Sequence, residues 1–417
     1  MDSFINSIDF FKGNDPEQIV ANYGTPLYVY SEEVIRSRMK AVAGVITKYD
    51  YTANYSIKAN TNIEILKVAL SEGINCDAMS VGELMILKKA GFPSDRIFFV
   101  PNNVCDEELE YAIDNDIVTS LDSLSQLEKY GQLASKKCKG YECAVRINPG
   151  VGAGHSDKVV TAGKKTKFGV AEADIDKIHE VLDRYGLKLV GINQHIGSQF
   201  LDPQPYLDAV RNLLRIARGF KGLKFIDFGG GYGIPYHKLD GEADYPMGDF
   251  KKRLEPILDE FVKDYGYAPL FKSEPGRFCV AEGGVILARV HAVKENYGHA
   301  YAGTDVGMHV LIRPAMYDSY HDVEIIRDGK VVPRENLSEI TVTGPICESG
   351  DIIAKDRLLP QIKEGDLACV LDAGAYGYSM ASTYNTRPRP AEVMICMDGS
   401  VKLIRRRETF EDLMRLF

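Results

Sequence analysis

The chain has 417 residues, of which 45% are hydrophobic and 26% charged, and its formal net charge is −9. This composition is typical of a globular protein with room for two domains, and the acidic balance argues against nucleic acid or an anionic membrane as the main partner. The N-terminus lacks the basic-then-apolar pattern of a signal peptide, and no apolar run reaches the roughly 18 residues that span a bilayer. The eight cysteines are scattered without Cys-x-x-Cys spacing, which favours reduced thiols in a cytoplasmic protein.

Eight strand-like runs alternate with helical patterns between residues 51 and 277, after a first helix expected at 32–49. The predicted strands are 51–58, 74–80, 96–101, 117–122, 142–149, 189–197, 224–230 and 269–275. The predicted helices between them are 61–71, 81–90, 105–114, 123–136, 173–185, 204–219 and 249–265. This alternation favours a closed, parallel (β/α)8 TIM barrel over 32–277. An open, doubly wound sheet is the structural alternative.

The pattern changes after Arg277 to short strands with few helices between them. These strands are expected at 285–290, 339–343, 367–371 and 391–396. The run Pro26–Tyr30 also has the pattern of a strand and is expected to join them. The sequence therefore predicts a discontinuous all-β domain, a β-sandwich or β-barrel, formed by 1–31 and 278–417.

Polar and glycine-rich residues gather where the predicted barrel strands end. The first strand ends in Lys58 and the second in Asp77, whereas the last three lead into His195–Ser198, Asp227–Gly231 and Glu274–Arg277. In a (β/α)8 barrel the C-terminal strand ends carry the catalytic groups, and phosphate often binds near strands seven and eight. These residues are therefore expected to meet at one end of the barrel.

Each of these residues has a functional and a purely structural interpretation. Lys58 is either a surface lysine or a desolvated amine that can form a Schiff base. Gly229–Gly231 is either a flexible turn or a nest of N–H groups for a phosphate. His195 could be a core histidine or could stack on a planar cofactor, and Glu274 could pair with Arg277 or with a pyridine nitrogen. Together they indicate pyridoxal 5'-phosphate as cofactor.

Four motifs resemble those of the group IV decarboxylases, pyridoxal phosphate enzymes with the alanine racemase-like fold (fold type III). The motifs are Tyr55–Asn60, His195–Gln199, Asp227–Gly231 and Glu274–Arg277. The resemblance covers nearly the whole chain and implies a barrel plus a β-domain built from both termini. It also implies that the cofactor contacts are Lys58, Asp77, His195, Ser198, Gly229, Gly230, Gly231, Glu274, Gly276 and Tyr376.

The second half of the chain is similar to the diaminopimelate decarboxylase branch of this family, through Arg313–Tyr317, Gly344–Asp351 and Ala373–Asn385. This similarity implies decarboxylation of meso-2,6-diaminopimelate to L-lysine and CO2, the last step of lysine biosynthesis. It implies substrate contacts from Arg277, Arg313, Tyr317, Glu348 and Tyr376, with Lys58, Cys347 and His195 as catalytic residues. Either Cys347 or Lys58 would return the proton. In the family Cys347 and Glu348 enter the neighbouring subunit's site, which implies a homodimer.

Several alternatives remain open at this point. A sister decarboxylase would act on ornithine, arginine, D-lysine or carboxynorspermidine. An alanine racemase-like isomerase predicts an arginine at the pyridine nitrogen, which Glu274 opposes. A non-catalytic relative that keeps the fold would not need Lys58, Glu274 and Cys347, which are all present. A metal enzyme is disfavoured because the histidines show no metal-ligand spacing. The glycine-rich loop over 150–169 is expected to act as a lid.

Overall fold

The computed structural model describes residues 2–150, 163 and 166–417. The chain divides into two compact units. The barrel unit comprises Arg38–Ile234 and Tyr245–Phe278, and the β unit comprises Met1–Ser37, Pro235–Asp244 and Cys279–Phe417. The loop predicted to act as a lid lies largely outside the described residues. The functional division into 32–277 and 1–31 with 278–417 stays a prediction.

Eight parallel strands form the closed barrel in the order β5-β4-β3-β2-β10-β9-β8-β6, and pairing of β5 with β6 completes the circle. Their bounds are β2 (Tyr51–Ser56), β3 (Asn75–Ala78), β4 (Ile97–Phe99), β5 (Val118–Leu121), β6 (Glu142–Asn148), β8 (Lys188–Asn193), β9 (Phe225–Asp227) and β10 (Leu270–Ser273). A two-residue strand, β7 (Val170–Ala171), extends β6. The prediction of a barrel is therefore confirmed, and the doubly wound alternative is wrong.

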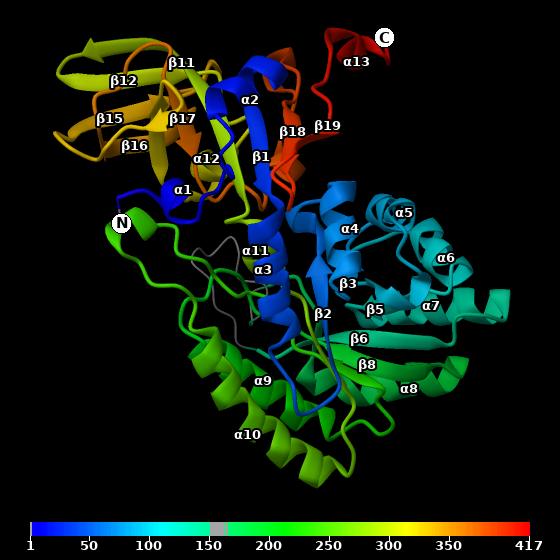
Figure 1. Ribbon diagram of the computed structural model, residues 1–417. Helices are drawn as coiled ribbons and strands as arrows, with labels where there is room; N and C mark the ends of the chain where they lie inside the picture. Colours follow the sequence, from blue (N-terminus) through cyan, green and yellow to red (C-terminus); the bar gives the residue numbers. More distant parts are fainter. Residues whose placement is uncertain (1, 151–162, 164–165) are drawn as a thin grey trace. The chain divides into compact units, whose positions relative to one another are not determined.

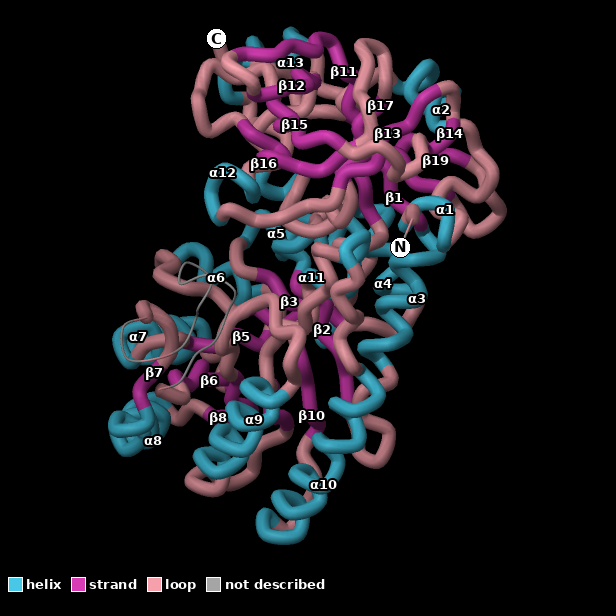
Figure 2. Tube along the Cα trace, turned by 90° about the vertical axis from the view of Figure 1, so that its left-hand side faces the viewer, coloured by secondary structure: helices cyan, strands magenta, loops and turns pink. Residues whose placement is uncertain are grey.

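Helices follow the strands and cover the outside of the barrel (Figures 1 and 2). They are α4 (Ile63–Ser71), α5 (Val81–Ala90), α6 (Asp106–Asp114), α7 (Leu124–Lys137), α8 (Ile175–Tyr185), α9 (Gln204–Ala217) and α10 (Met247–Tyr265). Their starts have local causes: Ser80 and Ser123 accept hydrogen bonds from backbone N–H groups of the first turns of α5 and α7. The helix expected at 32–49 is α3 (Glu32–Ala43), which ends before Gly44, a poor helix former.

Apolar side chains fill the barrel interior, with one glycine making room for them. A cluster of Phe98, Val100, Ala144, Val190 and Phe225 is buried there, and the rings of Phe98 and Phe225 meet edge to face at 5.3 Å. A Cβ at Gly191 would overlap the Phe225 ring. These side chains pack together among the strands, and the ends of the strands are where a barrel of this kind has room for a site.

A ten-stranded mixed sheet makes up most of the β unit. β1 (Leu27–Ser31) pairs antiparallel with β11 (Gly284–Asn296) and parallel with β18 (Ala391–Ile395), so the N-terminal strand joins the C-terminal sheet as predicted. The other strands are β12 (His299–Thr304), β13 (Val323–Arg327), β14 (Lys330–Val331), β15 (Ser338–Thr343), β16 (Ile352–Leu359), β17 (Leu367–Val370) and β19 (Val401–Arg405). Short helices accompany them: α1 (Phe4–Ser7), α2 (Pro16–Tyr23), α12 (Arg313–Tyr317) and α13 (Phe410–Met414). A further short helix, α11 (Arg277–Val280), crosses the boundary of the two units.

The described part of the chain shows neither a membrane span nor a metal cluster. None of its helices combines the length and apolarity that a membrane span requires. Within residues 2–150, 163 and 166–417, no group of three or more His, Cys, Asp or Glu side chains is placed to hold a metal ion.

Candidate active site

Lys58 lies just beyond the end of the first barrel strand. β2 ends at Ser56, and the chain then forms a 3₁₀ turn over Ile57–Ala59, so the predicted strand 51–58 was two residues too long. The neighbours of Lys58 in this turn are buried, whereas Lys58 itself is half-buried. The turn therefore directs the amine to the C-terminal end of the barrel.

A cavity of about 280 Å³ opens beside Lys58 at this end of the barrel. Its walls come from the ends of six strands and the segments that follow them. The lining residues are Lys58, Met79, Val100, Asn102, Arg146, Lys167, Phe168, His195 and Glu274. The structure thus brings together three residues predicted from sequence, Lys58, His195 and Glu274, around one cavity.

Three buried carboxyl groups lie at the ends of the barrel strands, and one of them, Glu274, lines the cavity. Burial raises the pKa of Glu274, Asp227 and Asp77, and mutual repulsion between these groups raises each further. Ser56 Oγ donates to Asp77 Oδ1 at 2.8 Å, and Gly229 N donates to Asp227 Oδ1 at 2.9 Å. Glu274 Oε1 has no hydrogen-bond partner among the described residues, although it is buried. A buried carboxyl oxygen in this state is suited to receive a polar group of a ligand.

His195 is held in one tautomer at the cavity wall. The backbone N–H of Gly230 donates to His195 Nδ1 at 3.2 Å, so the ring proton of the neutral imidazole lies on Nε2. Burial lowers the pKa of His195, and the positive charges of Lys58 and Arg146 lower it further. A neutral, flat ring therefore borders the cavity.

The glycine loop after β9 is packed too closely for side chains. A Cβ at Gly229 would overlap the carbonyl oxygen of Gln194, and one at Gly230 would overlap that of Glu274. Gly229 and Gly231 also have positive φ values of 75° and 125°. The loop consequently follows the loops after β8 and β10 at backbone distance, as a phosphate nest requires.

Two further predicted residues, Ser198 and Arg277, contact each other beside this loop. Arg277 Nε and NH2 donate to Ser198 Oγ at 3.3 and 3.1 Å. Arg277 follows Gly276, which is buried at the turn after β10. The structure thus brings together Ser198, from the segment after β8, and Arg277, from the segment after β10.

The remaining predicted residues belong to the β unit. Cys347 is exposed, and its Sγ lies 3.5 Å from both Oδ1 and Nδ2 of Asn385. Tyr384 OH donates to Glu348 Oε1 at 2.6 Å. Cys347 and Glu348 are thus each paired with one residue of the Tyr384–Asn385 turn.

Arg313, Tyr317 and Tyr376 complete the predicted set in the β unit. Arg313 and Tyr317 are the first and last residues of α12, which places them one helical turn apart. Arg313 is buried, whereas Tyr317 and Tyr376 are half-buried. Tyr376 has a φ of 57°, a left-handed conformation that is uncommon for residues other than glycine.

Sequence reasoning missed part of the cavity wall. Arg146 in β6 is not among the predicted site residues, yet its guanidinium carbon lies 4.4 Å from the centre of the Phe168 ring, and the residue lines the cavity. An arginine inside an otherwise apolar strand was the signal that could have identified it. Lys167 and Asn102 lie in segments without a periodic pattern, and no signal in the sequence marks them.

Comparison with known proteins places these features in a family. Residues 32–281 match the family described as "Pyridoxal-dependent decarboxylase, pyridoxal binding domain". The chain is 40% identical to a diaminopimelate decarboxylase of Methanothermobacter thermautotrophicus, over 97% of this chain and 94% of that protein. Its fold is similar to the crystal structure of diaminopimelate decarboxylase from Helicobacter pylori complexed with L-lysine, with a TM-score of 0.88, 30% identity, and 96% and 98% of the two chains covered.

A second solved structure agrees with this assignment. Diaminopimelate decarboxylase from M. jannaschii in complex with L-lysine has a TM-score of 0.87 and 32% identity, with 96% of this chain and 94% of that chain covered. Similarity of this extent reaches well beyond the barrel and includes the sheet of the β unit. The chain therefore belongs to the diaminopimelate decarboxylase family of pyridoxal-dependent decarboxylases.

Proposed function

We propose that this protein decarboxylates meso-2,6-diaminopimelate to L-lysine and CO2 with pyridoxal 5'-phosphate as cofactor, the last step of lysine biosynthesis. The observation that carries the proposal is the cavity shared by Lys58, His195 and Glu274. An amine, a flat neutral ring and a buried acid around one cavity match the parts of a pyridoxal phosphate. The relatives named diaminopimelate decarboxylase support the choice of substrate.

The chemistry of the cavity residues fits this cofactor. Glu274 offers a buried carboxyl oxygen without a partner among the described residues, which suits a ring nitrogen. The glycine loop Gly229–Gly231 offers backbone N–H groups at a position where any Cβ would overlap neighbouring backbone or a ring. We assign the phosphate to this loop with Ser198, Gly276 and Tyr376, and the covalent link to Lys58.

The bound cofactor supplies an electron sink for the pair left behind when CO2 departs. The raised pKa of Glu274 keeps a proton available at the ring nitrogen, where it makes the sink effective. His195 stays uncharged and covers one face of the ring, so that it adds no charge to the site. Asp77 accepts a hydrogen bond from Ser56 and stays buried near Lys58.

Substrate recognition is assigned to charged and phenolic side chains. Arg277, Arg313 and Tyr317 bind the carboxylate that the product retains, because guanidinium groups and a phenol match its oxygen atoms. Glu348 binds the distal ammonium group, and Tyr376 borders both substrate and cofactor. Cys347 or Lys58 returns a proton to the carbon that has lost CO2.

A homodimer with shared sites is part of the proposal. Cys347 and Glu348 are exposed on the single chain, where a second subunit could use them. We assign the two domains to 32–277, which binds the cofactor, and to 1–31 with 278–417, which carries these two residues. A biosynthetic enzyme of this kind acts in the cytoplasm.

A panel of substrates tests the proposed function. The purified protein with added pyridoxal phosphate is given meso-diaminopimelate, ornithine, arginine, D-lysine and carboxynorspermidine in separate reactions, and CO2 and amine products are measured. We expect CO2 and L-lysine from meso-diaminopimelate, with little turnover of the others and none by Lys58→Ala. Preferred turnover of another substrate would assign the protein to a sister decarboxylase and would require a different role for Glu348.

A further inference from the structure

Arg313 is one of the most deeply buried large side chains of the β unit, with 2% of its surface exposed. Its NH1 lies 2.8 Å from His321 Nε2, and its NH2 donates to Ser319 Oγ at 3.4 Å. The guanidinium carbon lies 4.8 Å from the centre of the Tyr236 ring. Contacts from three sides therefore fix the direction of this guanidinium.

His321 is completely buried and both of its ring nitrogens have a defined partner. Nδ1 lies 2.7 Å from the carbonyl oxygen of Leu371. A carbonyl oxygen can only accept, so Nδ1 carries the ring proton; a guanidinium can only donate, so Nε2 accepts from Arg313. The two contacts together require the neutral imidazole in one tautomer.

A neutral acceptor orients an arginine without adding negative charge beside it. A carboxylate in the place of His321 would form an ion pair with Arg313 and compete with any carboxylate that approached it. The Tyr236 ring packs edge-on against His321 at 5.3 Å and keeps the imidazole in place. The cluster thus holds Arg313 rigidly while the imidazole contributes no competing anion.

We propose that His321 is a positioning residue that aims Arg313 at the substrate carboxylate that the product retains, and so sets the preference for ligands that carry this carboxylate. The inference rests on the proposed function. Loss of His321 should weaken recognition of the carboxylate and leave recognition of the two amines unchanged.

Inhibition by L-lysine and by cadaverine separates these two effects. The two diamines have the same carbon chain between their amines, but only lysine has a carboxylate. In His321→Ala holoenzyme we expect the inhibition constant of lysine to rise roughly 10-fold or more, as for loss of a hydrogen bond to a charged group, and that of cadaverine to stay within about twofold. The KM for meso-diaminopimelate should rise together with the inhibition constant of lysine.

Two amide variants test for rescue. The amide oxygen of His321→Gln reaches the position of Nε2 and can accept from Arg313, whereas the shorter His321→Asn reaches only the position of Nδ1. We expect the Gln variant to recover most of the lysine affinity and the Asn variant not to, and this contrast remains available if His321→Ala fails to fold. His237→Ala, an exposed histidine of the same unit, is the matched control and should affect neither ligand.

The possible outcomes separate the inference from the proposed function. A wild-type protein that forms no lysine would refute the proposed function. A wild-type protein that forms lysine, with variants that weaken lysine and cadaverine equally or weaken neither, would overturn the role of His321 alone.

Discussion

Replacement of Lys238 by methionine should destabilise the β unit strongly. Lys238 Nζ lies 2.7 Å from Asp372 Oδ1 and 2.9 Å from Glu282 Oε1. The three residues are 5%, 0% and 2% exposed. Loss of the ammonium leaves two carboxyl groups buried without their cation, which typically costs about 3–5 kcal/mol. For a unit of this size, that loss lowers Tm by roughly 10 °C.

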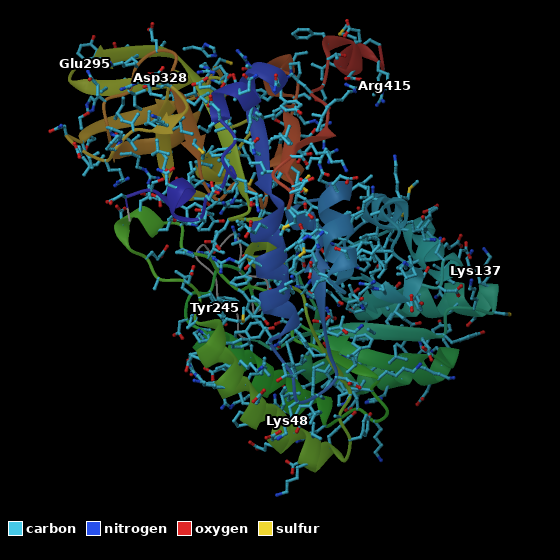
Figure 3. All side chains as sticks on the ribbon, in the orientation of Figure 1. Lys48, Lys137, Tyr245, Glu295, Asp328 and Arg415 are labelled. Carbon is cyan, nitrogen blue, oxygen red and sulfur yellow. The ribbon has the colours of Figure 1, made fainter. Side chains whose placement is uncertain are left out.

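Differential scanning calorimetry measures this effect, with Lys137→Met as the matched control. Lys137 lies at the outer end of α7 (Figure 3) and forms a 3.0 Å ion pair with Asp114 on the surface, where such a pair contributes little. A double variant, Lys238→Met with Asp372→Asn, should recover part of the lost Tm because it removes one of the two buried carboxylates that no longer face Lys238. A Tm for Lys238→Met no lower than that of Lys137→Met would refute the reasoning.

The pH dependence gives an independent check. Burial raises the pKa of Asp372 above its value in the unfolded chain, although Lys238 opposes this rise. The folded protein therefore binds the proton of Asp372 more tightly than the unfolded chain does. As pH falls and Asp372 is protonated, its contribution to the free energy of unfolding becomes more favourable to the folded state. Without Lys238 the pKa of Asp372 rises further. The difference in free energy of unfolding between the wild type and Lys238→Met should therefore become smaller from about pH 8 toward pH 6.

Three further predictions concern the proposed site. Glu274→Gln should keep the cofactor, as judged by absorbance, but its kcat should fall roughly 100-fold because a neutral amide cannot keep the ring nitrogen protonated. An unchanged kcat would contradict this role of Glu274. Gly230→Ala should weaken binding of pyridoxal phosphate in a titration, because its Cβ would overlap the Glu274 carbonyl oxygen. Tyr384→Phe removes the 2.6 Å hydrogen bond to Glu348 and should raise the KM for diaminopimelate about fivefold with kcat retained.

The barrel could be predicted from sequence because its local signals agree with its topology. The barrel strands are short and mostly buried, and several of the helices that follow begin at a serine or asparagine cap, as Asn62, Ser80 and Ser123 illustrate. Parallel strands that alternate with helices then place their C-terminal ends together. For this reason Lys58, His195 and Glu274 were correctly expected to share one end of the barrel.

The β unit was predicted less completely, since its strands depend on partners far away in the chain. The prediction omitted β12, β13, β14, β16 and β19. In β13 a buried Glu324 interrupts the apolar pattern, and its carboxylate accepts hydrogen bonds from Ser3 and Phe4 at the other end of the chain. No pattern in the sequence around Glu324 shows that donors from a distant segment will form hydrogen bonds with its carboxylate.

The surroundings of the functional residues were the least accessible part. Cys347 and Glu348 were identified through family resemblance, whereas their contacts with Asn385 and Tyr384 depend on a turn that lies more than thirty residues later. The position of Arg313 against His321 likewise follows from packing within the β unit. Motifs in the sequence identified these residues, and only the fold supplied their neighbours.

Chemical trapping tests whether Lys58 carries the cofactor. Two lysines, Lys58 and Lys167, line the cavity, so attachment to the cavity in general does not suffice. The protein is incubated with pyridoxal phosphate, reduced with borohydride, digested, and its peptides are mapped by mass spectrometry. We predict a phosphopyridoxyl group on the peptide that contains Lys58. Modification of Lys167 instead, or of neither residue, would show that Lys58 does not carry the cofactor.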